Sequence, residues 1–81
     1  MSQVYTVPLL LTAQPAGGYT VTSPVLPELL TEGDTIAEAL LHVQDAFAAV
    51  LEMYEDMGRP LPTAVHPAPG TIQLDYAVAV P

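Results

Sequence analysis

Three side chains that can bind a metal ion or move a proton stand close together in the middle of the chain: Glu38, His42 and Asp45. In a helix, spacings of four and three residues place all three on one face, a geometry that can hold a metal ion. The same spacing is more common among charged and polar side chains that simply face water. We therefore predict no metal site here and no cofactor for the protein.

The other reactive residue types do not combine into a catalytic site. The sequence has no cysteine, which excludes thiolate nucleophiles and thiolate metal ligands. Gly17 and Gly18 precede a strand-like segment rather than a helix, so they do not form a phosphate-binding loop. His66 is interpreted as a loop residue, and Asp75 as a lone carboxylate on the outside of a strand, which is too little for a metal-dependent nuclease. We predict that the chain is not an enzyme.

The charge of the chain is strongly one-sided. Nine acidic residues face one base, Arg59, which gives a formal net charge of −8. Binding to nucleic acid depends on several lysines or arginines that displace counterions from phosphates, so direct nucleic-acid contact is not expected. An acidic surface suits a basic protein partner, although the same charge can serve only to keep a small apolar protein in solution.

One long helix is predicted to position the polar cluster. Thr35 and Glu38 have the spacing of a capping box, so the helix begins at Ile36, and Gly58 ends it. One face of this helix is apolar: Ile36, Leu40, Val43, Phe47, Val50, Tyr54 and Met57. The opposite face is polar, and it holds our candidate partner-binding residues: Glu38, His42, Asp45, Glu52 and Asp56.

Alternating apolar residues predict strands around this helix. Tyr5–Thr12 and Tyr19–Ser23 form a hairpin, and its first strand is expected to be interrupted near Pro8, which has no N–H for a sheet ladder. A third strand at Leu29–Glu32 and a fourth at Ile72–Val80 complete the order β-β-β-α-β. The predicted fold is α+β: a single domain, residues 1–81, with one four-stranded sheet and the helix packed on one face. The last strand is expected beside the first, after a right-handed crossover.

The uncovered sheet face is predicted to be an interface. Val4, Leu10, Ala77 and Ala79 lie on that face in this register, and small domains often gain stability from association. We therefore expect a homo-oligomer, either a dimer or a tetramer. The sequence shows no signal peptide and no apolar run long enough to span a membrane, so a cytoplasmic protein without membrane contact is expected.

Three segments in this order resemble the HicB antitoxin family of bacterial toxin–antitoxin pairs, which have a degenerate ribonuclease-H-like fold. Pro24–Pro27 is similar to the family's P-x-L-P segment, Thr31–Ala39 to its T-x-G-D-T-x-x-E-A segment, and Gly58–Pro62 to its G-x-P-L-P segment. The resemblance covers residues 4–62. Glu28 stands where the family usually has glycine.

The resemblance implies a binding partner and an activity. HicB antitoxins neutralise HicA toxins, which are small basic mRNA-cleaving ribonucleases with a double-stranded-RNA-binding-like fold. Many family members add a C-terminal DNA-binding domain, whereas this chain is expected to be a short form without one, so we carry over toxin binding and not operator binding. The alternative is a stand-alone, homo-oligomeric structural or regulatory protein of the same fold, with no toxin partner.

Overall fold

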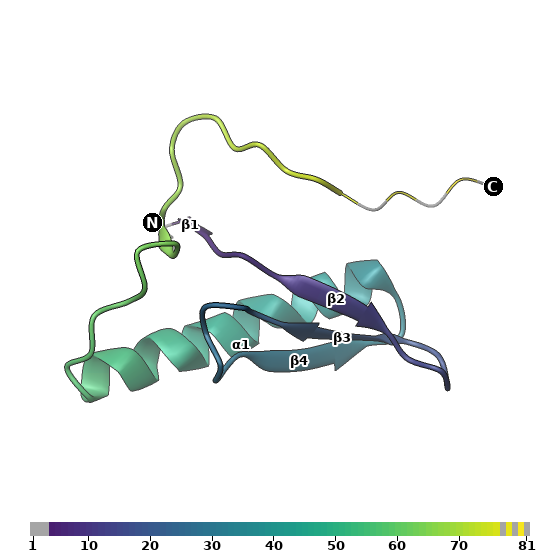
Figure 1. Ribbon diagram of the computed structural model, residues 1–81, viewed down its shortest axis with the longest axis horizontal. Coiled ribbons are helices and arrows are strands. Elements are labelled where there is room, and N and C mark those ends of the chain that lie inside the picture. Colours follow the sequence, from purple (N-terminus) through teal and green to yellow (C-terminus); the bar gives the residue numbers. More distant parts are fainter. Residues whose placement is uncertain (1–3, 77, 79, 81) are drawn as a thin grey trace.

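The computed structural model describes residues 4–76, 78 and 80 of the chain, and it places one long helix among several short strands (Figure 1). The predicted α+β class is confirmed. The elements, in chain order, are β1 (Tyr5–Thr6), β2 (Leu10–Ala13), β3 (Tyr19–Thr22), β4 (Leu30–Gly33), α1 (Ile36–Asp56) and β5 (His66–Pro67).

Helix α1 begins at the predicted residue because Thr35 caps it. The Thr35 hydroxyl accepts a hydrogen bond of 3.0 Å from the backbone N–H of Glu38, which satisfies a donor that the helix itself leaves free. At the other end Gly58 adopts the left-handed conformation with φ of 63°, and the N–H of Arg59 donates to the carbonyl of Tyr54. The predicted glycine stop is confirmed.

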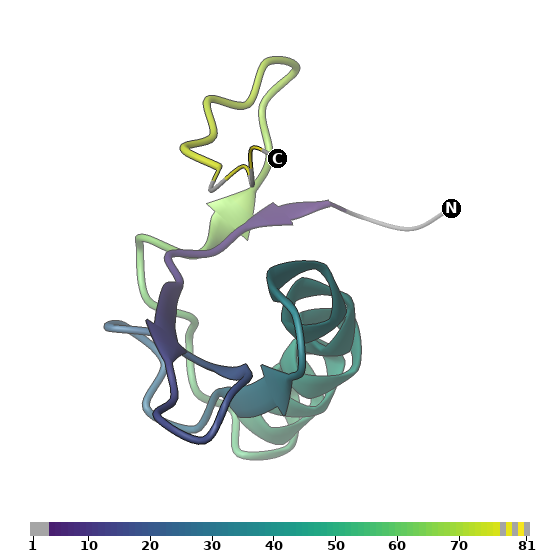
Figure 2. The same cartoon turned by 90° about the vertical axis from the view of Figure 1, so that its right-hand side faces the viewer.

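The predicted hairpin is confirmed for Leu10–Ala13 and Tyr19–Thr22, which form part of an antiparallel sheet in the order β2-β3-β4. The first part of its predicted first strand is wrong, because Tyr5–Thr6 pairs with β5 in a separate sheet. Gly17 and Gly18 both have positive φ in the turn that joins β2 to β3. Leu11 pairs with Val21, which in turn pairs with Thr31. This row lies on the buried face of the sheet, where the side chain of Val21 is completely buried. Helix α1 lies along one side of the sheet (Figure 2).

The opposite face of this sheet is uncovered, as predicted. Leu10 and Leu30 flank Thr22 in one row across the three strands, and their side chains are 54% and 67% exposed. Val4, which was expected on this face, lies instead beside β1, outside the three-stranded sheet, where its carbonyl accepts a hydrogen bond from the N–H of Ala68. Ala77 and Ala79, also expected on this face, lie outside the described residues.

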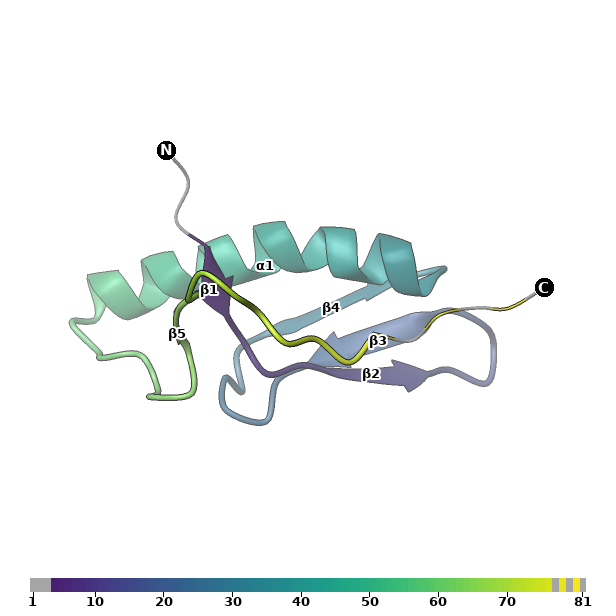
Figure 3. The same cartoon turned by 90° about the horizontal axis from the view of Figure 1, so that it is seen from above.

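The predicted fourth strand at Ile72–Val80 and the single four-stranded sheet are wrong for the described residues. The structure has two small sheets: the three-stranded sheet, and a separate pair in which β1 is antiparallel to β5 (Figure 3). Residues 71–76, 78 and 80 belong to no strand. The physical reason is that an alternating apolar pattern becomes a strand only where a sheet edge accepts its hydrogen bonds, and β5 already pairs with β1.

The core is built by residues from β3, from α1, from the connection between β3 and β4, and from the connection between α1 and β5. Val50 and Tyr54 of the predicted apolar helix face are buried, whereas Met57 is 52% exposed because it lies beyond the last helical residue, at the C-cap. Ala39 is fully buried although the sequence analysis did not include it. The buried apolar residues are Val21, Leu26, Leu29, Ala39, Val50, Tyr54 and Val65.

The close approach of β4 to the start of α1 depends on Gly33. A Cβ atom at this position would lie 2.7 Å from the Cα of Ala39 and 2.8 Å from the carbonyl carbon of Glu38, and both are backbone atoms that no rotamer change can move. We expect Gly33→Ala to lower the midpoint of thermal unfolding by several degrees, because a misfit of this kind costs about 1–3 kcal/mol. Circular dichroism at 222 nm measures the midpoint.

Gly70→Ala is the matched control for this substitution. A Cβ atom there would meet no heavy atom within 4 Å, and Gly70 does not have a positive φ. We expect its midpoint to stay within about one degree of the original chain, because surface substitutions away from special features change stability little. Equal midpoints for the two variants would show that the packing of Gly33 against the helix backbone is unimportant.

Candidate partner-binding face of helix α1

The five candidate residues all lie on α1, and the helix brings them to one face. Their spacing places them in a stripe about 27 Å long, because each helical residue adds about 1.5 Å. Glu38 is half-buried near the start of the helix, and the other four side chains are exposed. The members of the stripe are Glu38, His42, Asp45, Glu52 and Asp56.

His42 has a role that the sequence analysis missed. Its Nδ1 lies 2.6 Å from the backbone carbonyl oxygen of Glu32 in β4. A carbonyl only accepts hydrogen bonds, so Nδ1 carries the proton and donates it, and Nε2 remains directed away from this bond. The ring therefore ties the first half of α1 to β4 while its side chain stays exposed.

An acidic hollow continues the stripe past the start of the helix. It has a volume of about 340 Å³ and lies where the β2–β3 turn, the end of β4 and the first helical turns meet. Glu32, Asp34 and Glu38 all line it, together with His42 and Gly18. The sequence analysis did not bring Glu32 and Asp34 to this site, because their position depends on the tight turn between β4 and α1.

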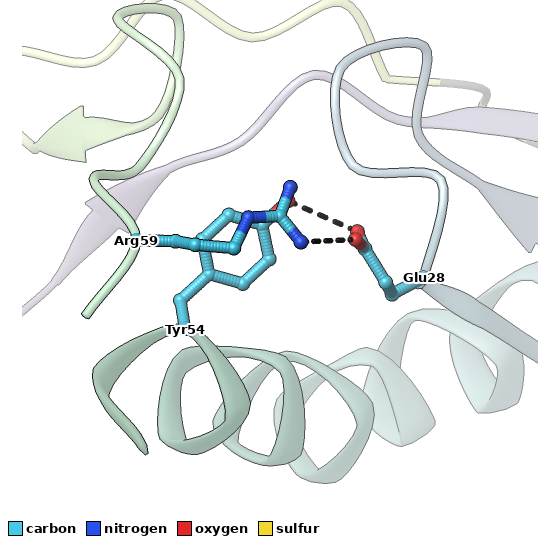
Figure 4. Close-up of polar contacts among 3 residues, drawn as sticks. All are labelled: Glu28, Tyr54 and Arg59. Carbon is cyan, nitrogen blue, oxygen red and sulfur yellow. Dashed lines mark hydrogen bonds and ion pairs between the residues drawn. The ribbon is translucent and has the colours of Figure 1, made fainter. Parts of the chain in front are cut away.

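Arg59, the only lysine or arginine of the chain, pairs with residues of the same chain at the other end of the helix, although its side chain is half-exposed (Figure 4). Its Nη1 lies 3.4 Å from Oε1 of Glu28, and its Nη2 donates to the Tyr54 hydroxyl at 3.4 Å. The Tyr54 hydroxyl donates to Oε2 of Glu28 at 3.1 Å, and the guanidinium carbon lies 4.5 Å from the centre of the Tyr54 ring. Glu28, which stands where the HicB family usually has glycine, thus pairs with the only basic side chain.

The surroundings shift both titrating groups of this cluster. The pKa of the Glu28 carboxyl is lowered, first by the hydrogen bond from its own backbone N–H and further by Tyr54 and Arg59, although partial burial opposes the shift. The pKa of the Tyr54 hydroxyl is raised, first by desolvation and then by its bond to Glu28. The cluster therefore favours an ionised Glu28 and a neutral Tyr54.

The remaining reactive residues of the sequence analysis do not gather at this face. His66 lies in β5, paired with Thr6, so its prediction as a loop residue is wrong. Asp75 is exposed. Among the residues that the structure describes, no three His, Asp or Glu side chains lie close enough to hold a metal ion. Within the same residues no helix has the length and apolar character needed to cross a membrane.

These features define a small acidic α+β domain with a polar face on its one long helix. The chain is 35% identical over 74 residues to Antitoxin HicB of Escherichia coli (strain K12), a match that covers 89% of this chain and 54% of that protein. It is 39% identical over 69 residues to Antitoxin HicB 1 of Photorhabdus laumondii subsp. laumondii, covering 85% and 41%. No family model matches the chain.

Over most of its length the chain is homologous to the HicB antitoxins. It spans about half the length of these curated relatives. The resemblance found in the sequence analysis is thus confirmed, and homology to proteins named antitoxins supports the prediction that the chain is not an enzyme.

The cluster around Glu28 predicts a specific loss of stability in acid. Because its pKa is lower in the folded chain than its usual value of 4.5, ionised Glu28 stabilises the fold above about pH 4.5, and this contribution disappears as the pH falls further. We expect Glu28→Gln to lower the thermal unfolding midpoint at pH 7. Between pH 5 and about pH 3 the midpoint of this variant should fall by fewer degrees than that of the original chain. Thermal unfolding across this pH range measures the difference.

Glu55→Gln provides the comparison for this experiment, since Glu55 is exposed on the same helix and its side chain takes no part in the Arg59 cluster. The plot of unfolding midpoint against pH for Glu55→Gln is expected to run parallel to that of the original chain. If Glu28→Gln also ran parallel to the original chain, Glu28 would contribute nothing to the acid sensitivity of the fold.

Proposed function

We propose that this chain is an antitoxin module that binds and neutralises a small, basic, HicA-like toxin that cleaves mRNA. The observation that carries the proposal is the homology to HicB antitoxins over 89% of the chain. The module acts by binding: its acidic surface covers the part of the toxin that would otherwise contact RNA. No step requires a cofactor or a metal ion.

The charge of the chain supports a basic partner. A formal net charge of −8 attracts a basic protein over a distance set by ionic strength and speeds the encounter between the two. Arg59 does not oppose this attraction, because Glu28 pairs with it. The same charge disfavours direct contact between this chain and nucleic acid.

The polar stripe of α1 is the proposed toxin-binding face. Glu38, His42, Asp45, Glu52 and Asp56 present four carboxylates on one side of a rigid helix, and the acidic hollow extends them to Glu32 and Asp34. A hollow of about 340 Å³ with three carboxylates in its lining suits the guanidinium or ammonium group of a partner's side chain.

A second candidate function is a stand-alone, homo-oligomeric structural or regulatory protein without a toxin. The exposed row of Leu10 and Leu30 on the uncovered sheet face favours this candidate, because exposed apolar side chains are typical of interfaces. The gene neighbourhood distinguishes the two. A neighbouring reading frame for a short Lys- and Arg-rich protein favours the antitoxin, and its absence favours the stand-alone protein.

Charge reversal on the stripe tests the proposed face. The product of such a neighbouring reading frame is titrated with this chain in a calorimeter, and RNA cleavage is assayed in the same mixtures. We expect a stoichiometric complex that stops cleavage, and a loss of affinity of at least about tenfold for the double variant Asp45→Lys, Glu52→Lys, because each reversed charge faces a basic surface.

Glu55→Lys, Asp75→Lys is the matched control, with the same total change of charge at two exposed positions off the stripe. It is expected to weaken binding less, and only through the net charge. Equal losses for the two double variants would remove the stripe from the interface. Undiminished RNA cleavage in the presence of excess original chain would contradict the antitoxin proposal itself.

A further inference from the structure

The C-terminal segment, which we define as residues 71–76 with Val78 and Val80, exposes an apolar side chain at every second position. Ile72, Leu74, Tyr76, Val78 and Val80 are between 51% and 85% exposed. Thr71, Gln73 and Asp75 occupy the alternate positions. In an extended chain this pattern gives one continuous apolar edge and one polar edge. So much exposed apolar surface in a chain of this size is typical of a binding element.

The same chain contains an unfilled apolar groove, which we call the β1–α1 groove. It has a volume of about 770 Å³ and lies between the stretch around β1 and the middle of the helix. Tyr5 and Phe47 meet across it, with ring centroids 5.6 Å apart in an edge-to-face arrangement. Its main apolar lining residues are Tyr5, Val7, Leu9, Val43, Phe47 and Leu51.

Within one chain the segment does not reach this groove. The N–H of Ala68 donates to the carbonyl of Val4, which fixes the start of the final stretch at β1. Beyond that bond the segment lies on one side of β1 and helix α1 on the other, both in Figure 1 and in the view turned by 90° in Figure 2. The apolar edge therefore has no partner in its own chain among the described residues, and neither has the groove.

We propose that two copies of this chain exchange these parts, so that the C-terminal segment of each copy fills the β1–α1 groove of the other. The lengths agree. Val43 to Leu51 span about 12 Å along the helix axis, and Ile72 to Tyr76 span about 13 Å as an extended strand. The groove thus accommodates the side chains of Ile72, Leu74 and Tyr76, while Gln73 and Asp75 face the solvent.

The chemistry of both parts favours a second copy over a basic protein. The segment carries one charged group, Asp75, and the groove lining contains no charged residue. Apart from Asp75 on the polar edge of the segment, neither surface offers a carboxylate to a lysine or arginine, and each offers apolar side chains that can pack against the other. Exchange between two copies also closes the assembly, because one two-fold axis satisfies both segments and both grooves at once.

Molar mass tests the exchange directly. Size-exclusion chromatography coupled to light scattering is expected to give twice the chain mass of 8.5 kDa for the original protein and a single chain mass for Leu74→Asp. Gln73→Asp is the matched control, since it adds the same charge one residue away on the polar edge, and it is expected to keep the double mass. Leu74 is 72% exposed within one chain, so its variant retains the helix signal in circular dichroism.

A nuclear Overhauser experiment on the original protein locates the contact. The chain has one phenylalanine, Phe47 in the groove, and two isoleucines, Ile36 in the helix and Ile72 in the segment. Mixing chains labelled at phenylalanine with chains labelled at the isoleucine methyl groups is expected to give an interchain contact between Phe47 and Ile72. A single chain mass for the original protein, an unchanged mass for Leu74→Asp, or a mixed sample without this contact overturns the exchange.

Discussion

The fold depends on the close contact between the end of β4 and the backbone of the first helical turn. Gly33 has no side chain, so β4 approaches Ala39 and Glu38 closely enough for Ala39 to be fully buried. Asp34 and Thr35 then turn the chain in two residues, and the Thr35 cap fixes where the helix starts. This short turn sets the angle at which α1 crosses the sheet, and with it the faces of the helix that are buried and exposed.

The polar surface follows from the same turn. With the apolar side of α1 against β3 and β4, the stripe from Glu38 to Asp56 faces outward, and Glu32 and Asp34 join its first residue around the acidic hollow. At the far end of the helix Tyr54 and Glu28 hold Arg59. The only cation is thereby paired inside the chain, and the surface offered to a partner is acidic from one end of the helix to the other.

The sequence predicted those features that local signals determine. Thr35 and Gly58 gave both ends of the helix, the glycine pair gave the hairpin turn, and the helical spacing gave the common face of the five candidate residues. Features that depend on distant partners were not predictable. The alternating apolar residues at Ile72–Val80 indicate a strand, but the pattern does not show which sheet edge that strand would pair with. Glu28 and Arg59 are 31 residues apart, and no local pattern connects them.

The central claim is that this homologue of HicB antitoxins binds a basic toxin through an acidic surface. Purification of the tagged full chain from its own host at moderate salt, with mass spectrometry of what accompanies it, tests this claim most directly. We expect a small Lys- and Arg-rich protein from the neighbouring reading frame, released at high salt because screening weakens the attraction. Recovery of this chain with itself alone would contradict the claim and favour a self-assembling protein without a toxin.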